Sequence, residues 1–235
     1  PGLYFAQLQT QRRVVPMAAK LVVITMLCFC VCAHAQTRPL AVYPGPAEGL
    51  DSTTTHSIDQ ELRRLLSPAG VDVTWRTGTN EASRGQQGRM VVGTFAGRCS
   101  VETIAVRRTS PSDIRTLAET SISNGRILPY FTVDCDRVIR TLAPMLEPLS
   151  PPLRQAVLGR ALARVIAHEI YHILAETTDH ADTGIAKAQM TFKDLTADGF
   201  DLSPTSLQRI RAAYRQGPAA VVPIAGLVPP GSPKR

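Results

Sequence analysis

The sequence predicts an α+β domain in which a small mixed β-sheet packs on one long, buried helix. Two observations support this fold class. Four short apolar segments with strand-like patterns come first, between residues 38 and 133. A wide apolar stripe then runs through residues 153–174, a pattern typical of a helix that is buried on most of its faces. The order, strands first and then the buried helix, favours one sheet against one helical layer.

The first half of this domain is divided by prolines, glycines and small polar residues. Residues 38–43 are apolar and stop at a Pro-Gly-Pro turn, which indicates a first strand. Apolar residues at helical spacing over 58–66 predict a helix, with a Ser or Thr cap before it and a stop at Pro68 and Gly70. Alternation over 71–75 predicts a second strand, and the polar residues 76–88 a solvated loop.

The second half contains the strongest strand and the longest helix. Residues 89–95 and 126–133 are predicted strands, and Pro129 makes the latter an edge or bulged strand because proline cannot donate to the ladder. A short helix is expected over 136–142, before a run of prolines. Ser150 as N-cap and Pro151 at the first position begin the long helix. A last helix is expected over 203–213.

Both ends of the chain are expected to lie outside the domain. Met17 and Lys20, an apolar run over 21–32 and an Ala-His-Ala end are typical of a secretory signal peptide, with residues 1–16 upstream of the true start. The run is too short for a comfortable membrane span, so no stable span is expected after cleavage. We predict an exported protein, periplasmic or secreted, with a domain over 36–216 and a disordered Pro- and Gly-rich tail over 217–235.

Charge and cysteine content restrict the partners and the compartment. The formal charge is +7, and three basic residues of the leader contribute to it, which leaves +4 for the remainder. The basic residues are scattered, so no nucleic-acid partner is predicted. Oligomeric state is not indicated.

Of the five cysteines only Cys99 and Cys135 follow the leader, and an even pair in an exported chain favours a disulfide over two free thiols. Metal ligation by this pair is a poor alternative, since neither cysteine has a close Cys or His partner in sequence.

The most informative motif is His168-Glu169-Ile170-Tyr171-His172. Residues four apart on a helix differ by about 40° in direction, so both imidazoles can reach one metal ion. Glu169 lies on the neighbouring strip of the helix, where it can take a proton from water that zinc has acidified. The apolar flanks favour metal binding over two structural histidines, which would be costly to bury without partners.

A catalytic zinc site needs a third protein ligand and an open position, and His180 is the preferred residue for that role. The alternative interpretation is a solvated loop histidine. Carboxylates that could replace or orient it are Glu176, Asp179 and Asp182. His56, far upstream, is interpreted as a surface or cap residue.

The segment His168–Met190 resembles the zincin metallopeptidases, specifically a metzincin-type arrangement in which HExxHxxGxxH precedes a Met-turn. Ala175 stands at the family's glycine and Thr178 at its third histidine, and Gly184-Ile185-Ala186 is similar to a Gly-Ile-Met turn with Ala in place of Met. The HExxH-x7-H spacing is similar to a group of uncharacterised exported bacterial proteins regarded as zinc proteases. The resemblance implies a zincin-like catalytic domain over 36–216, with His168, His172 and His180 as Zn²⁺ ligands and Glu169 as general base.

The function implied is a zinc peptidase that acts on a peptide or protein substrate. One alternative is a zinc-binding envelope domain without catalysis, which acts as a binding or scaffold module; another is an envelope domain without metal. The intact Glu169 favours the enzyme. For an oxyanion donor the choices are Tyr171, for which a core role is favoured, and Tyr130 on the expected edge strand 126–133, which could also pair with an extended substrate.

Overall fold

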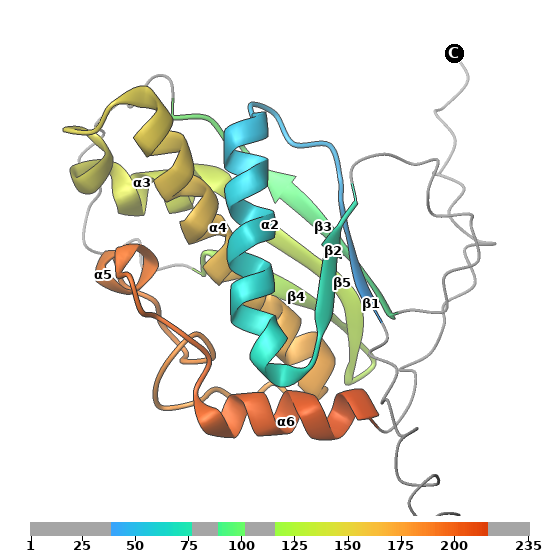
Figure 1. The fold of residues 1–235 in the computed structure, drawn as a ribbon. Helices are drawn as coiled ribbons and strands as arrows, with labels where there is room; N and C mark the ends of the chain where they lie inside the picture. The colour runs from blue at the N-terminus through green and yellow to red at the C-terminus, as the bar shows by residue number, and fades with distance from the viewer. Residues whose placement is uncertain (1–38, 77–88, 102–115, 216–235) are drawn as a thin grey trace, which may run out of the picture. The chain divides into compact units, whose positions relative to one another are not determined.

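The computed structural model describes residues 39–76, 89–101 and 116–215. The predicted signal peptide and tail, and almost all of the predicted loop 76–88, lie outside these residues. Figure 1 colours the helices and strands along the chain, from blue at the N-terminus to red at the C-terminus. The elements in chain order are β1 (Pro39–Pro44), α2 (Ser52–Leu66), the 3-10 turn η1 (Ser67–Ala69), β2 (Asp72–Trp75), β3 (Arg89–Ala96), β4 (Ala118–Ser123), β5 (Arg126–Asp134), α3 (Cys135–Leu146), α4 (Pro151–Ala175), α5 (Phe192–Thr196) and α6 (Pro204–Arg215).

The five strands form one mixed sheet in the order β2-β1-β3-β5-β4. The β1–β2, β1–β3 and β3–β5 pairs are parallel, and β4 runs antiparallel to β5. A mixed sheet with separate helices is consistent with the predicted α+β class. Its order places β4, the antiparallel strand, at one edge of the sheet.

The prediction that residues 126–133 form an edge strand is wrong, because β5 lies between β3 and β4. The alternative prediction was a bulged strand, and the ladder between β4 and β5 is indeed irregular. Thr120 pairs with Phe131 but Ile122 pairs with Ile127, so the register shifts opposite the stretch that contains Pro129. A break in the ladder accommodates a residue that has no amide hydrogen to donate.

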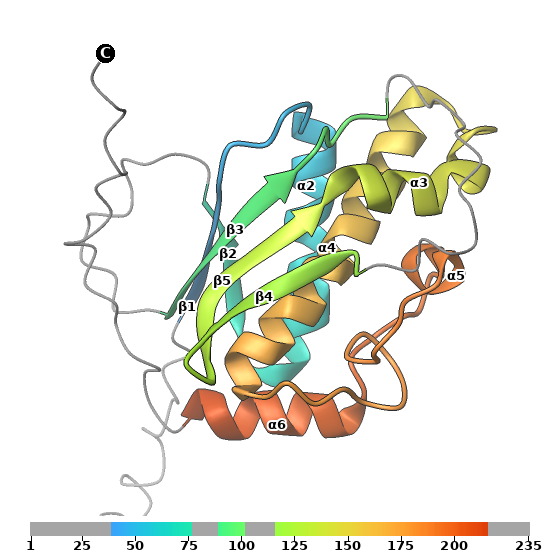
Figure 2. The same ribbon diagram turned by 180° about the vertical axis from the view of Figure 1, so that it is seen from behind.

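Helices α2 and α4 cover the same face of the sheet, as the two opposite views show (Figures 1 and 2). The apolar stripes of both helices are buried in one hydrophobic core, which also includes Phe131 and Val133 of β5. The two helices approach closely at Gly159, where an added Cβ would lie 2.6 Å from the carbonyl oxygen of Thr54. The long helix is therefore fixed by packing along most of its length, as its sequence predicted.

The ends of the helices differ in detail from the predictions. Helix α2 begins at Ser52 and is capped by Asp51, whose carboxylate accepts the Thr54 amide at 2.8 Å, rather than by a Ser or Thr. Ser150 and Pro151 begin α4 as predicted. Helix α3 continues through Pro144 to Leu146, four residues past the predicted end. Pro144 has no amide hydrogen to donate within the helix. Because it lies in the last turn of α3, the helix loses a single hydrogen bond near its end.

A buried ion pair joins α2 to α4. The Arg164 side chain is 0% exposed, and its Nε donates to Glu61 at 2.9 Å. Arg64 donates to the same carboxylate, and Arg164 Nη1 donates to the Asp194 carbonyl oxygen at 2.7 Å, which ties α5 to the pair. Burial opposes ionisation of Glu61, but the hydrogen bonds and charges of the two arginines outweigh it and lower the pKa of Glu61.

The predicted disulfide is present between Cys99 and Cys135, whose Cα atoms are 5.0 Å apart. Both residues are completely buried. The bond joins the chain just after β3 to the first residue of α3 across a sequence separation of 36, and the segment it encloses includes β4 and β5.

No helix in the described part of the chain is both long enough and apolar enough to span a bilayer.

Candidate metal centre

Helix α4 brings His168, Glu169 and His172 into one partly enclosed site. Their exposed fractions are 8%, 4% and 7%. The two histidines are one helical turn apart, and their Nε2 atoms face each other at 3.1 Å. A tetrahedral zinc ion with bonds of about 2.05 Å would hold two nitrogens roughly 3.3 Å apart, so this pair already has the spacing of a chelate.

The chain leaves α4 through a left-handed residue. Helix α4 ends at Ala175, and Glu176 follows with φ 49°. The amides of Glu176 and Thr177 both donate to the His172 carbonyl oxygen. The Thr177 carbonyl oxygen in turn lies 2.7 Å from Nδ1 of the His172 ring. The turn therefore orients one of the two helical histidines.

The turn Gly184-Ile185-Ala186 orients the other. The Ile185 carbonyl oxygen lies 2.8 Å from His168 Nδ1, and Ile185 and Ala186 are completely buried. Gly184 has φ +74°, and a Cβ there would lie 2.4 Å from the Asp201 carbonyl oxygen, so glycine is required at this position. The segment that resembles a Met-turn thus lies directly against the predicted metal ligands.

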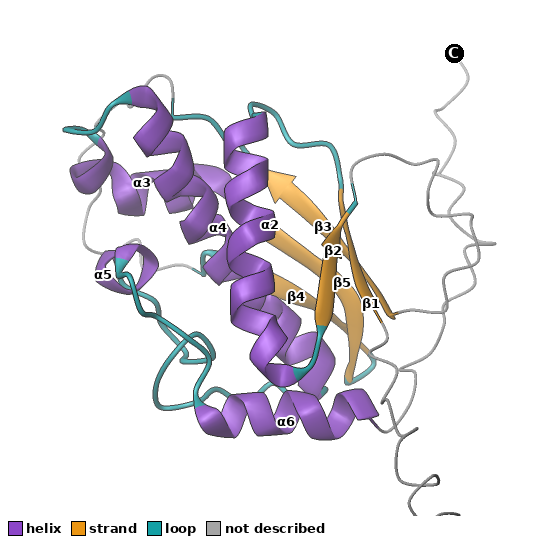
Figure 3. Cartoon of the chain, viewed as in Figure 1, coloured by secondary structure: helices purple, strands orange, loops and turns teal. Residues whose placement is uncertain are grey.

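The structure places His180 beside the other two histidines. Its ring centroid lies 5.2 Å from that of His168 and 4.8 Å from that of His172. The potential ligand atoms of the three residues all lie within 4.8 Å of one another, and no other such group of His, Cys, Asp or Glu occurs in the described residues. His180 is exposed on the loop after α4, drawn in teal in Figure 3.

The alternative ligands lie outside this cluster. Glu176, Asp179 and Asp182 are not among its members. Glu176 is exposed, and Asp179 lies 3.9 Å from Arg209 of α6. His56 is exposed in the first turns of α2, in agreement with its interpretation as a surface residue.

The hydrogen bonds of the two buried rings define which nitrogen is free. A carbonyl oxygen only accepts, so Nδ1 of His168 and of His172 must each carry a proton. Burial lowers the pKa of His168 to about 4 and also lowers the pKa of His172, which keeps both rings neutral near pH 7. Two neutral rings protonated at Nδ1 present two bare Nε2 lone pairs to each other. Such a pair repels unless a cation lies between them.

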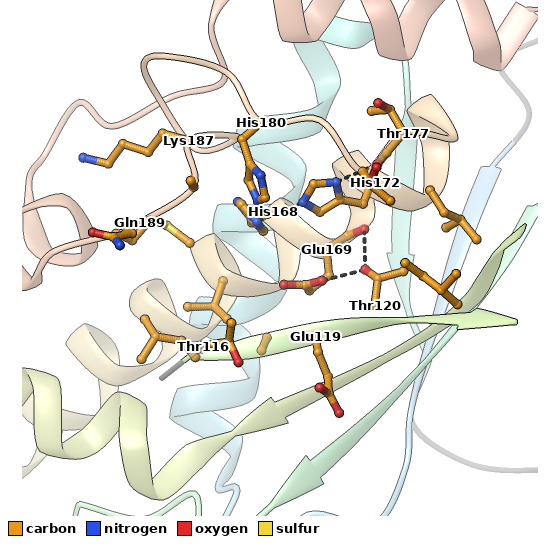
Figure 4. Close-up of a pocket in the computed structure, with 18 of the residues that line it drawn as sticks. Thr116, Glu119, Thr120, His168, Glu169, His172, Thr177, His180, Lys187 and Gln189 are labelled. Carbon is orange, nitrogen blue, oxygen red and sulfur yellow. Dashed lines mark hydrogen bonds between the residues drawn. The ribbon is translucent and has the colours of Figure 1, made fainter. Parts of the chain in front are cut away.

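Among the described residues, the carboxylate of Glu169 has one hydrogen-bond partner, which lies on the edge strand. Thr120 Oγ1 donates to Glu169 Oε2 at 2.6 Å (Figure 4). Burial raises the pKa of Glu169 to about 7; the nearby Glu119 adds to this, whereas the Thr120 hydrogen bond opposes it. A carboxylate with a pKa close to neutral both accepts and returns a proton at neutral pH.

The site opens into a cleft of about 560 Å³. Residues 116–120, which comprise the start of β4 and the two residues before it, line one wall. Residues 187–190 line the other, and α4 contributes Val165, His168, Glu169 and His172. Figure 4 shows the three imidazoles converging above Glu169, with Thr120 rising toward it from β4. Volumes of roughly 300–1,000 Å³ are typical of ligand sites, so the cleft is large enough for a segment of a peptide.

Neither tyrosine considered as an oxyanion donor reaches this cleft. Tyr171 is completely buried and accepts a hydrogen bond from Arg209 at 3.2 Å, as its core interpretation predicted. Successive side chains of a strand point to opposite faces of the sheet. Phe131 is buried in the core, so the neighbouring Tyr130 lies on the other face of β5, and it does not line the cleft. The proposal for Tyr130 is therefore wrong. The sequence did not reveal Thr120.

A scan against protein-family models found no matching family, and searches of curated proteins and of solved structures found no significant match.

Proposed function

We propose that this protein is a zinc-dependent hydrolase of peptide bonds. The observation that carries the proposal is the 3.1 Å distance between Nε2 of His168 and Nε2 of His172, whose Nδ1 atoms each face a carbonyl oxygen, with His180 adjacent. Three imidazoles leave one position of a tetrahedral ion open, which is the ligand set of catalytic rather than structural zinc. The resemblance of His168–Met190 to the zincins supports the same assignment.

The residues around the site have separate roles in this proposal. His168, His172 and His180 would hold the ion. When bound, zinc supplies Lewis-acid chemistry, which acidifies water and polarises a carbonyl group. In this proposal Glu169 accepts the proton of the attacking water and returns it to the leaving amine. Ile185 and Thr177 hold the histidine rings in the tautomer that ligation requires.

The edge strand supports a peptide as the substrate class. One side of β4 pairs with β5, and no described strand pairs with its other side. The β4 segment also lines the cleft beside Glu169. An extended peptide can add to such an edge through main-chain hydrogen bonds, which bind without regard to side-chain identity. In this proposal an extended substrate therefore pairs with β4, and not with residues 126–133 as the sequence first suggested.

An exported location remains part of the proposal. It is supported by the leader-like sequence before residue 36 and by the buried disulfide, since disulfides persist in oxidising compartments.

The proposal is tested by zinc quantification and digestion of a peptide library with wild type, Glu169→Ala and Glu147→Ala. Glu147 is an exposed residue at the end of α3 and serves as the matched control. We expect all three proteins to bind one zinc ion and only Glu169→Ala to lose cleavage. Absence of bound zinc, or cleavage unchanged by Glu169→Ala, would refute the proposal. Zinc binding without any cleavage would instead indicate a zinc-dependent binding module.

A further inference from the structure

The hydroxyl group of Thr120 is the only hydrogen-bond partner of the Glu169 carboxylate within the described residues. The 2.6 Å distance is that of a strong O–H···O⁻ bond, in which the hydroxyl donates because an ionised carboxylate only accepts. Glu169 is 4% exposed, so little water competes for that oxygen. The contact joins residues 49 positions apart, on β4 and on α4.

The local structure of β4 holds this hydroxyl in place. Thr120 pairs with Phe131, and the register of the ladder changes directly after it, before Ile122. Irregularities of this kind bend a strand and redirect a side chain. Threonine is branched at Cβ, so its hydroxyl has few orientations on a strand. The donor is therefore rigid, whereas a glutamate has three side-chain torsions to restrain.

We infer that Thr120 is a positioning residue, which holds one carboxylate oxygen of Glu169 so that the other is directed to the proton it transfers. This inference rests on the proposed hydrolase function. Its physical basis is that a base restrained in advance loses less orientational freedom in the transition state. Because Thr120 belongs to the edge strand, the same residue connects the proposed peptide-binding edge to the base.

The experiment compares Thr120→Val, which removes the hydroxyl and keeps the shape, with Thr120→Ser, which keeps the hydroxyl. Thr132→Val is the matched control, since Thr132 lies on the adjacent strand and shares a 2.8 Å hydrogen bond with Thr94, away from the cleft. For each protein, zinc content, kcat and KM are measured. Crystal structures of the metal-free proteins give the orientation of Glu169, independently of activity.

For Thr120→Val we expect full zinc content, a kcat lower by roughly 10- to 100-fold and little change in KM, with recovery in Thr120→Ser. In the crystal of Thr120→Val the Glu169 carboxylate should occupy more than one rotamer. A kcat equal to that of Thr132→Val, a change confined to KM, loss of zinc, or an unmoved Glu169 would each overturn the inference. If wild type cleaves no peptide, the proposed function fails, and the orientation of Glu169 still decides whether Thr120 positions it.

Discussion

Replacing the three histidines one at a time should separate metal binding from fold stability. In His168→Ala the Ile185 carbonyl oxygen loses its 2.8 Å donor in a fully buried turn. Leaving a buried acceptor unsatisfied costs about 1–3 kcal/mol, and we expect the metal-free variant to be less stable by that amount. His180 is exposed, and its removal should change the stability of the metal-free protein by about 0.5 kcal/mol or less.

Zinc binding should respond differently, because it needs all three imidazoles. We expect both variants to lose stoichiometric zinc, although only one loses stability. The free energy of unfolding is measured by urea denaturation after chelation, and the zinc content by elemental analysis after reloading. His56→Ala is the matched control, since His56 is exposed on α2 and outside the cluster. Full zinc content in His180→Ala, or equal destabilisation by His180→Ala and His168→Ala, would refute this reasoning.

Two further predictions concern stability alone. The pKa of Glu61 is lowered below 4.5 in the folded protein, so its charge contributes stability that is present above that pH and lost as the pH falls through the lowered value. Glu61→Gln, which breaks the pair with Arg164, should therefore destabilise by about 3 kcal/mol near neutral pH and by less in acid; urea unfolding at several pH values measures this, and a pH-independent difference would contradict it. Glu176 has a left-handed conformation that disfavours side chains, so Glu176→Gly should raise the melting temperature, with a gain of about 1 kcal/mol or less. An unchanged or lower melting temperature would show that the turn is not strained.

Periodic patterns were sufficient for the elements that pack in the core. The stripe over residues 153–174 predicted α4 because burial on many faces requires apolar residues at helical spacing. The HExxH motif placed His168, Glu169 and His172 together for the same reason, since helix geometry alone determines their spacing. The disulfide followed from the count of cysteines and the expected compartment.

The edge of the sheet was harder to predict because it is not buried in the same way. The sequence Ala-Glu-Thr-Ser-Ile-Ser of β4 is largely polar, and its two apolar residues, Ala118 and Ile122, are too few to indicate a half-buried strand. The signal that could have revealed it is Asn124-Gly125, with φ 50° and 72°, between β4 and β5. This dipeptide is typical of two-residue hairpin turns. Without β4, neither the true edge nor the contact of Thr120 with Glu169 could be inferred.

The disulfide has a consequence for limited proteolysis of the protein. The bond between Cys99 and Cys135 closes a covalent ring that includes the whole of β4. A single peptide-bond cut between residues 100 and 134 opens this ring but leaves the two fragments joined through sulfur. A nicked molecule therefore keeps Thr120 covalently attached to the chain that carries Glu169, and the fragments separate only in a denaturant that also contains a thiol.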